Sequence, residues 1–151
     1  MMMDVKGLGY FDGKVHVLPL RIYYEDTDLS GVVYHANYLK YMERARTEFF
    51  RLAGVTQMAD LESPEPTAWA IRGVDLKFMR PGRVDDTLSV KTICTGISGA
   101  RMTALQRVHC GDTLLVEGRI EACIITLTGR PRRIPQHVRD LLLPFLCEAG
   151  T

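Results

Sequence analysis

The sequence has almost no net charge and no long hydrophobic run, and these two absences exclude whole classes of protein. Its 19 Lys and Arg residues against 18 Asp and Glu residues leave a formal charge of +1, whereas a dedicated nucleic-acid-binding domain usually carries a strong basic excess. The longest uncharged apolar runs, at 122–127 and 141–146, are far shorter than the roughly 18 residues that a membrane-spanning helix needs. We therefore expect no nucleic-acid partner and no transmembrane segment.

The sequence also lacks metal-binding motifs and the pattern of a signal peptide. The four cysteines include no CxxC pair, and the four histidines show no ligand spacing, so we expect neither a metal site nor a cofactor. The start of the chain lacks the basic and apolar regions of a signal peptide. Each cysteine lies in an apolar or strand-like stretch, so we expect buried reduced thiols in a cytoplasmic protein.

What is present is the composition of one ordinary globular domain, with 151 residues of which 25% are charged. Apolar residues recur at three- and four-residue steps over 38–53, which predicts one long amphipathic helix. Asn37 is suited to the start of this helix and Gly54 to its end. Alternating apolar residues predict five strands, at 15–24, 69–79, 87–95, 101–110 and 114–127.

These elements predict an α+β domain over 14–135, in which one long helix lies against a five-stranded, mostly antiparallel sheet. Residues 1–13 hold three glycines and no sustained period, so we expect a flexible N-terminal tail. Residues 136–151 are predicted to form a C-terminal helical extension. A single helix cannot cover the whole sheet, and a second copy of the chain would protect the exposed face or edge.

The segment richest in chemistry joins the first strand to the helix and reads YYEDTDLSGVVYHANY over 23–38. Two carboxylates, Asp26 and Asp28, precede a helix N-terminus, where unpaired backbone N–H groups carry partial positive charge. Such N–H groups stabilise a carbonyl oxygen under attack, and a nearby carboxylate attacks the carbonyl carbon or activates water. The alternative is that both aspartates only form turns and caps.

This segment, followed by ERARTE at 43–48, closely resembles the active-site signature of the 4-hydroxybenzoyl-CoA thioesterase family. Within that family it looks like the acyl-CoA thioesterase subgroup associated with the bacterial Tol–Pal system. The near-continuous match runs from 21 to 51, and weaker similarity extends to about residue 135. The resemblance implies a hotdog fold, in which the sheet wraps the long helix, and a homodimer or a dimer of dimers.

The resemblance also implies roles for individual residues. Asp28 stands at the position of the catalytic carboxylate, as general base or nucleophile, and His35 supplies the backbone amide that holds the thioester carbonyl. Residues matching the motif and predicted to line the substrate site are Tyr24, Gly31, Val32 and Asn37. Arg101 and Arg130 are candidates for contacts to the CoA phosphates, often made from the neighbouring subunit. Solvated surface arginines are the alternative interpretation of both.

The function implied is hydrolysis of a short- to medium-chain or aromatic acyl-CoA to a free acid and CoA, without metal or cofactor. A non-catalytic module that binds acyl-CoA or an acyl carrier protein is the main alternative, and an envelope-associated scaffold is a third. A triad built on Ser30 and His35 is disfavoured because the G-x-S-x-G nucleophile elbow is absent.

Overall fold

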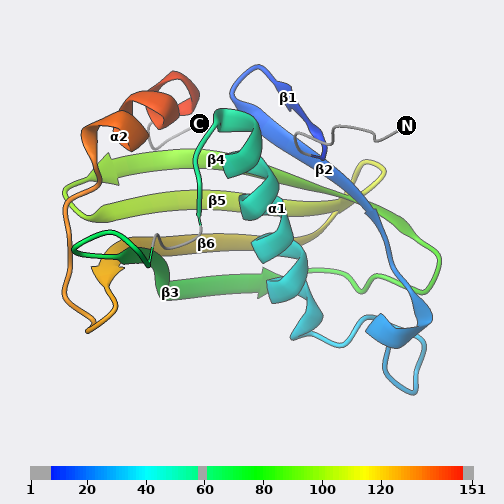
Figure 1. Cartoon of the computed structure of the whole chain (residues 1–151). Helices are drawn as coiled ribbons and strands as arrows, with labels where there is room; N and C mark the ends of the chain where they lie inside the picture. Colours follow the sequence, from blue (N-terminus) through cyan, green and yellow to red (C-terminus); the bar gives the residue numbers. More distant parts are fainter. Residues whose placement is uncertain (1–7, 58–60, 148–151) are drawn as a thin grey trace, which may run out of the picture.

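The structure, a computed structural model, describes residues 8–57 and 61–147. One helix lies across one face of a single antiparallel sheet whose strand order is β1-β2-β4-β5-β6-β3 (Figure 1). The elements are β1 (Tyr10–Asp12), β2 (Val15–Arg21), η1 (Tyr24–Asp26), α1 (Asn37–Ala53), β3 (Thr67–Phe78), β4 (Thr87–Ser98), β5 (Arg101–Cys110), β6 (Thr113–Thr126), α2 (Gln136–Leu142) and η2 (Leu143–Phe145).

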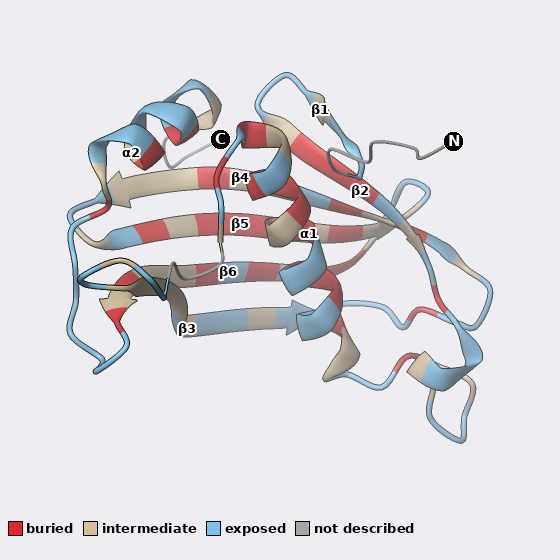
Figure 2. Ribbon diagram, viewed as in Figure 1, coloured by how far each residue is buried: buried red, intermediate tan, exposed pale blue. Residues whose placement is uncertain are grey.

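The long helix forms where its apolar stripe predicts it. The stripe packs inward, with Tyr41, Met42 and Phe49 almost fully buried, and Figure 2 shows this buried side of α1 turned toward the sheet. Gly54 ends the helix in a left-handed conformation with φ of 91°, which glycine adopts without a steric penalty. The N-terminus differs from the prediction, because Ala36 is the capping residue and Asn37 is the first residue of the helix.

The two halves of α1 pack into two different clusters. Its first half lies on the central strands through Met42, close to Gly118, where an added Cβ would come within 2.7 Å of a Leu76 methyl and 3.0 Å of the Met42 sulfur. Its second half packs with α2 and η2 through Phe49, Phe50 and their neighbours. The start of α1 is therefore held tightly against the sheet.

The sheet has six strands where the sequence predicted five. The additional strand, β1, pairs with β2 and falls within the segment expected to be a flexible tail; residues 1–7 of that tail lie outside the described residues. Of the helical extension expected over 136–151, the described residues form α2, which ends at Leu142, and the short η2, while residues 148–151 lie outside the described residues. All four cysteines are free as predicted, but only Cys94 is buried and the other three are half-buried, because they lie near the ends of strands and of the chain.

The two edges of the sheet are unequal. One edge is β1, which is only three residues long. The other is β3, whose 12 residues pair with β6 on one side and with no strand of the described chain on the other. Ile71, Val74 and Phe78 on this strand are each about half exposed, at 47%, 45% and 52%. A long, partly apolar free edge is a site for pairing with another chain. No helix within the described residues is long and apolar enough to span a bilayer.

Candidate active site

In the segment between β2 and α1, hydrogen bonds join the residues that follow β2 to the residues at the start of the helix. The Asp26 carbonyl accepts from the Asn37 side-chain amide at 2.8 Å and from the Tyr34 backbone N–H at 2.9 Å. The Asp26 carboxylate accepts from the Tyr23 N–H at 2.9 Å and so holds the η1 turn. Asn37 therefore positions the loop with its side chain instead of capping α1.

A second loop, at 79–86, forms hydrogen bonds with this segment and with the first turn of α1. The Gly82 carbonyl accepts from the Val33 N–H at 2.9 Å, and the Gly82 N–H donates to the Tyr38 hydroxyl at 3.0 Å. An added Cβ at Gly82 would lie 2.8 Å from the end of the Ile22 side chain. A larger residue there would force the Ile22 side chain or the loop to shift.

Asp28 lies at the tip of the loop, in a turn that also includes Ser30 and Gly31. Its carboxylate Oδ1 accepts from the Ser30 N–H at 2.8 Å and from the Ser30 hydroxyl at 2.5 Å. Gly31 has φ of +82°, a left-handed conformation that favours glycine, and its N–H donates to the Asp28 carbonyl. The hydrogen bond from the Ser30 side chain, followed by that from its backbone, lowers the pKa of the Asp28 carboxyl. Val32, after this turn, is half-buried and bridges to Arg83.

Two backbone N–H groups at the start of α1 are unpaired. Within the described part of the chain, His35 and Ala36 donate no backbone hydrogen bond, whereas the next amide, of Asn37, donates to the Tyr34 carbonyl at 2.9 Å. Such groups at a helix N-terminus favour an oxygen that carries negative charge. The His35 ring lies beside the ring of Tyr34, at 4.6 Å between centroids, and near Phe78, at 6.3 Å. The unpaired amides are thus next to the C-terminal end of the free edge strand β3.

In a single chain this site is open. Asp28 and His35 are exposed, Tyr24 is 85% exposed, and none of the four main cavities of the described residues is lined by any of the three. The Asp28 carboxylate and the unpaired N–H groups therefore lie on one loop but do not line a cavity in the described chain.

The two arginines predicted to contact CoA are not part of this loop. Arg101 begins β5 and pairs with Glu121 at 3.3 Å, and Arg130 follows β6, where its N–H donates to the Thr126 hydroxyl. The start of β5 and the end of β6 lie at the end of the sheet opposite the segment that joins β2 to α1 (Figure 1). Within one chain, the structure does not bring Arg101 or Arg130 to Asp28.

Three residues that shape the site were not predicted. Ser30 stands at a variable position of the motif, although Asp followed two residues later by Ser is a common turn pattern that could have indicated its hydrogen bond to Asp28. Tyr38 and Gly82 meet across 44 residues of sequence, and no local pattern signals such a contact. The described residues contain no group of three His, Cys, Asp or Glu side chains placed to hold a metal ion.

Comparisons with known proteins identify the class. Residues 30–117, more than half of the chain, match the family model described as Thioesterase superfamily, which begins two residues after Asp28. The chain is 38% identical over 122 residues to the acyl-CoA thioester hydrolase YbgC of Escherichia coli O6:H1, which covers 80% of this chain and 90% of that protein. It is 30% identical over 138 residues to the acyl-acyl carrier protein thioesterase ATL2 of Arabidopsis thaliana, covering 90% and 72%.

A solved structure agrees with this result. A probable thioesterase from Bartonella henselae superposes with a TM-score of 0.76 at 37% identity, over 80% of this chain and 99% of that one. The fold is the predicted hotdog fold, with a sixth strand added. The chain belongs to the thioesterase superfamily.

The hydrogen bonds from Ser30 predict how the Asp28 carboxyl titrates. Ser30→Ala removes the largest contribution that lowers the Asp28 pKa, so this pKa rises toward its ordinary value, measured by NMR titration of the side-chain carboxyl. Because the ionised form is the one that would react, the acid limb of a pH–activity profile moves to higher pH. Ser98→Ala, at the far end of β4, leaves both unchanged. An unaltered Asp28 pKa in Ser30→Ala would contradict the assigned cause.

Proposed function

We propose that the protein hydrolyses an acyl-CoA thioester to a free acid and CoA at the Asp28 loop. The observation that carries this proposal is the pair of unpaired N–H groups at His35 and Ala36, on the same loop as an ionised carboxylate. The names of the curated relatives support the reaction class, because those from Escherichia coli and Haemophilus influenzae are acyl-CoA thioester hydrolases or thioesterases.

The reaction needs little more than these groups. The thioester carbonyl oxygen, which gains negative charge during attack, accepts from the His35 N–H, a contribution of about 10²–10³-fold to the rate for one such donor. Asp28 either takes a proton from the attacking water, worth about 10²–10⁴-fold, or attacks the carbonyl carbon itself to form an anhydride that water then opens. In both routes the C–S bond breaks, CoA leaves as the thiolate and takes up a proton, and the acid is released.

A second copy of the chain would close the site. Identical strands that pair antiparallel about a two-fold axis place the end of one opposite the beginning of the other, so a β3–β3 pair sets the Phe78 end beside residues near the start of the partner's strand. The ladder aligns Arg101 with Cys123 of β6 and, through it, with Ala70 near the start of β3. The pairing therefore carries one chain's Arg101 toward the other chain's Asp28, where CoA phosphates would lie.

Four finer assignments are part of the proposal. These are the preference for short- to medium-chain or aromatic acyl groups, the 4-hydroxybenzoyl-CoA and Tol–Pal subgroup, a cytoplasmic location, and a dimer or a dimer of dimers. An acyl carrier protein as the carrier of the acyl group has one supporting observation, the similarity to the Arabidopsis acyl-acyl carrier protein thioesterases. A non-catalytic module that only binds acyl-CoA is the competing function.

Loss of the Asp28 carboxylate tests the reaction directly. Asp28→Asn removes the negative charge and the proton acceptor from an exposed side chain, so we expect normal folding and a loss of at least about 100-fold in kcat. Thiol release is measured with acetyl-, hexanoyl-, palmitoyl- and benzoyl-CoA. The matched control is Glu25→Gln, an exposed carboxylate on the same loop, which keeps its activity. Near-normal turnover by Asp28→Asn would remove Asp28 from the mechanism, and binding without thiol release by the native chain would favour the binding module.

Mixing two inactive variants tests whether each site uses two chains. Asp28→Asn and Arg101→Glu are each expected to be strongly impaired at low acyl-CoA concentration. In a mixed dimer one site carries both substitutions and the other carries neither, so random mixing after mild unfolding and refolding restores about a quarter of the native sites. If Arg101 served its own chain or no site at all, the mixture would show only the average of its two parents, and the two-chain site would be wrong.

A further inference from the structure

The N-terminal hairpin, which we define as residues 8–17, is fastened to the second half of α1 and to the turn η2 near the C-terminus. The Leu8 N–H donates to the Glu48 carboxylate of α1 at 2.6 Å. Phe11 of β1 stacks on Phe145 of η2, with 4.1 Å between the ring centroids. Segments from the two ends of the described chain therefore meet at α1 and form one clasp.

His16 of β2 is buried at the centre of this clasp. Its side chain has no exposed surface, and its ring lies 5.3 Å from the ring of Phe11 and 6.1 Å from that of Phe49, measured between centroids. Its Nε2 is 3.1 Å from the Leu8 carbonyl oxygen. A carbonyl only accepts hydrogen bonds, so Nε2 carries the proton of the neutral ring. Its Nδ1 is buried and has no hydrogen-bond partner in the described chain.

The hairpin backbone fits closely around this ring. Gly9 approaches it so closely that an added Cβ would lie 2.9 Å from the ring carbon Cε1 of His16 and would also meet the Val17 carbonyl oxygen. The ring therefore cannot turn toward another acceptor unless the hairpin moves.

Glu48 is the charged group of the described chain whose charge favours a second proton on His16. Its carboxylate is already engaged, since it accepts from the Leu8 N–H and, at 3.5 Å, from the Arg51 guanidinium. Burial lowers the pKa of His16, and the Leu8 carbonyl and the charge of Glu48 oppose this only in part.

The other described elements packed against His16 present no carboxylate to it. β4 places the neutral Thr92 opposite it, and the Lys14 ammonium on the hairpin turn donates to the Leu146 carbonyl at 3.1 Å. Protonation of Nδ1 would therefore put a charged N–H into a buried place where no free acceptor faces it. Such a group costs more free energy buried than in water.

We propose that the N-terminal hairpin is a pH-sensitive clasp, which neutral His16 keeps closed and which protonation of His16 releases. In the released hairpin the ring is in water, and the pKa of His16 returns to its ordinary value of 6.5. Between this value and the lowered pKa of the closed form, the released form binds a proton that the closed form lacks. The clasp is therefore firmest above pH 6.5 and weakens as the pH falls below it.

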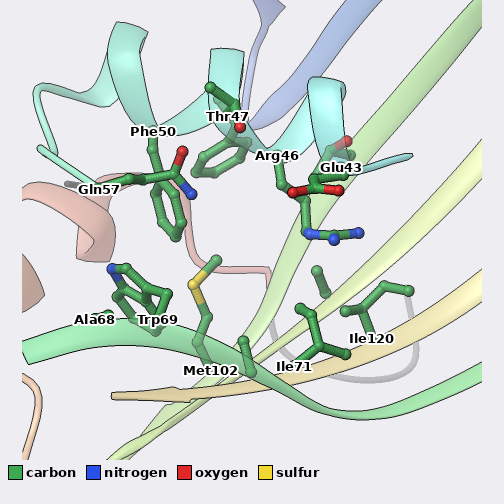
Figure 3. Close-up of a pocket in the computed structure, with 14 residues that line it drawn as sticks. Glu43, Arg46, Thr47, Phe50, Gln57, Ala68, Trp69, Ile71, Met102 and Ile120 are labelled. Atoms are coloured by element: carbon green, nitrogen blue, oxygen red, sulfur yellow. The ribbon is translucent and has the colours of Figure 1, made fainter. Parts of the chain in front are cut away.

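Release uncovers one side of the second half of α1. Phe49 loses its contacts with Phe11 and His16. The next residue, Phe50, stays stacked on Trp69 of β3 with 5.2 Å between ring centroids (Figure 3). The hairpin side of α1 becomes accessible while the packing of α1 on the sheet remains. The Asp28 loop precedes the opposite end of this helix, so the inference does not depend on the proposed function.

Amide hydrogen exchange measured by NMR reports release of the hairpin at single residues. Protection factors, which correct for the pH dependence of exchange itself, are compared at about pH 7.5 and about pH 5. In the native protein we expect protection of the β1 amides, which pair with β2, to fall at least about 5-fold at the lower pH, and that of β5 amides to stay unchanged. The His16 ring protons should titrate below pH 6.5.

Three variants assign the effect. His16→Gln keeps an N–H donor for the Leu8 carbonyl but cannot be protonated, so its β1 protection should be the same at both pH values. His137→Gln, at an exposed histidine on α2, should keep the full native response. Glu48→Gln should open more often at every pH, because the Leu8 N–H loses a charged acceptor, and should still respond to pH because His16 is intact.

The outcomes decide the proposal without any measurement of thioester hydrolysis. Equal β1 protection at the two pH values in the native protein, or a His16 ring that titrates at or above pH 6.5, overturns it. A response that persists in His16→Gln and disappears in Glu48→Gln also overturns it, since Glu48 would then be the titrating group. If His16→Gln already lacks β1 protection at neutral pH, the native titration and the Glu48→Gln response decide.

Discussion

The anchoring of one loop to the first turn of α1 is the constraint on which the candidate site depends. The Asp26 carbonyl holds Asn37 and Tyr34, and the Tyr38 hydroxyl holds Gly82 behind them. The Asp26 carbonyl, the acceptor in two of these contacts, is thereby already occupied. The N–H groups of His35 and Ala36 are left without partners in the described chain, on the same loop as Asp28, whose turn lowers the pKa of its carboxyl. Met42 packs closely on Gly118, and this contact fixes the first half of α1 against the sheet.

The free edge of β3 relates the Asp28 loop to the proposed dimer. The loop lies at the Phe78 end of this strand. In one chain it is exposed to water, whereas N–H donors stabilise a charged oxygen best in a site from which water is excluded. The same strand exposes apolar side chains and unpaired backbone groups, which are costly to leave in water and prone to uncontrolled pairing. The proposed two-fold β3–β3 pair would cover both the edge and the loop, and it would bring Arg101 of one chain toward the Asp28 loop of the other.

Much of the fold was predictable because it follows from local periodicity. The stripe from Tyr38 to Ala53 and the alternation in β3 to β6 are properties of the side chains themselves. β1 was missed because three residues are too few for a period, and it is held by distant partners: the Leu8 N–H donates to Glu48 at 2.6 Å, and Phe11 stacks on Phe145. For the same reason the sequence predicts Asn37 as a helix cap, whereas its side chain donates to a carbonyl 11 residues away. The hydrogen bond from Arg46 to Gln106 spans 60 residues and leaves no local signal.

The most direct measurement is a crystal structure of the Asp28→Asn protein with a hydrolysable acyl-CoA trapped in the site. The account predicts a dimer paired through β3, with the thioester carbonyl oxygen accepting from the His35 N–H. The side chain at position 28 should lie beside the carbonyl carbon, and the CoA phosphates should lie near arginines of the partner. An acyl group bound with its carbonyl away from the start of α1, or enclosed by one chain alone, would contradict it.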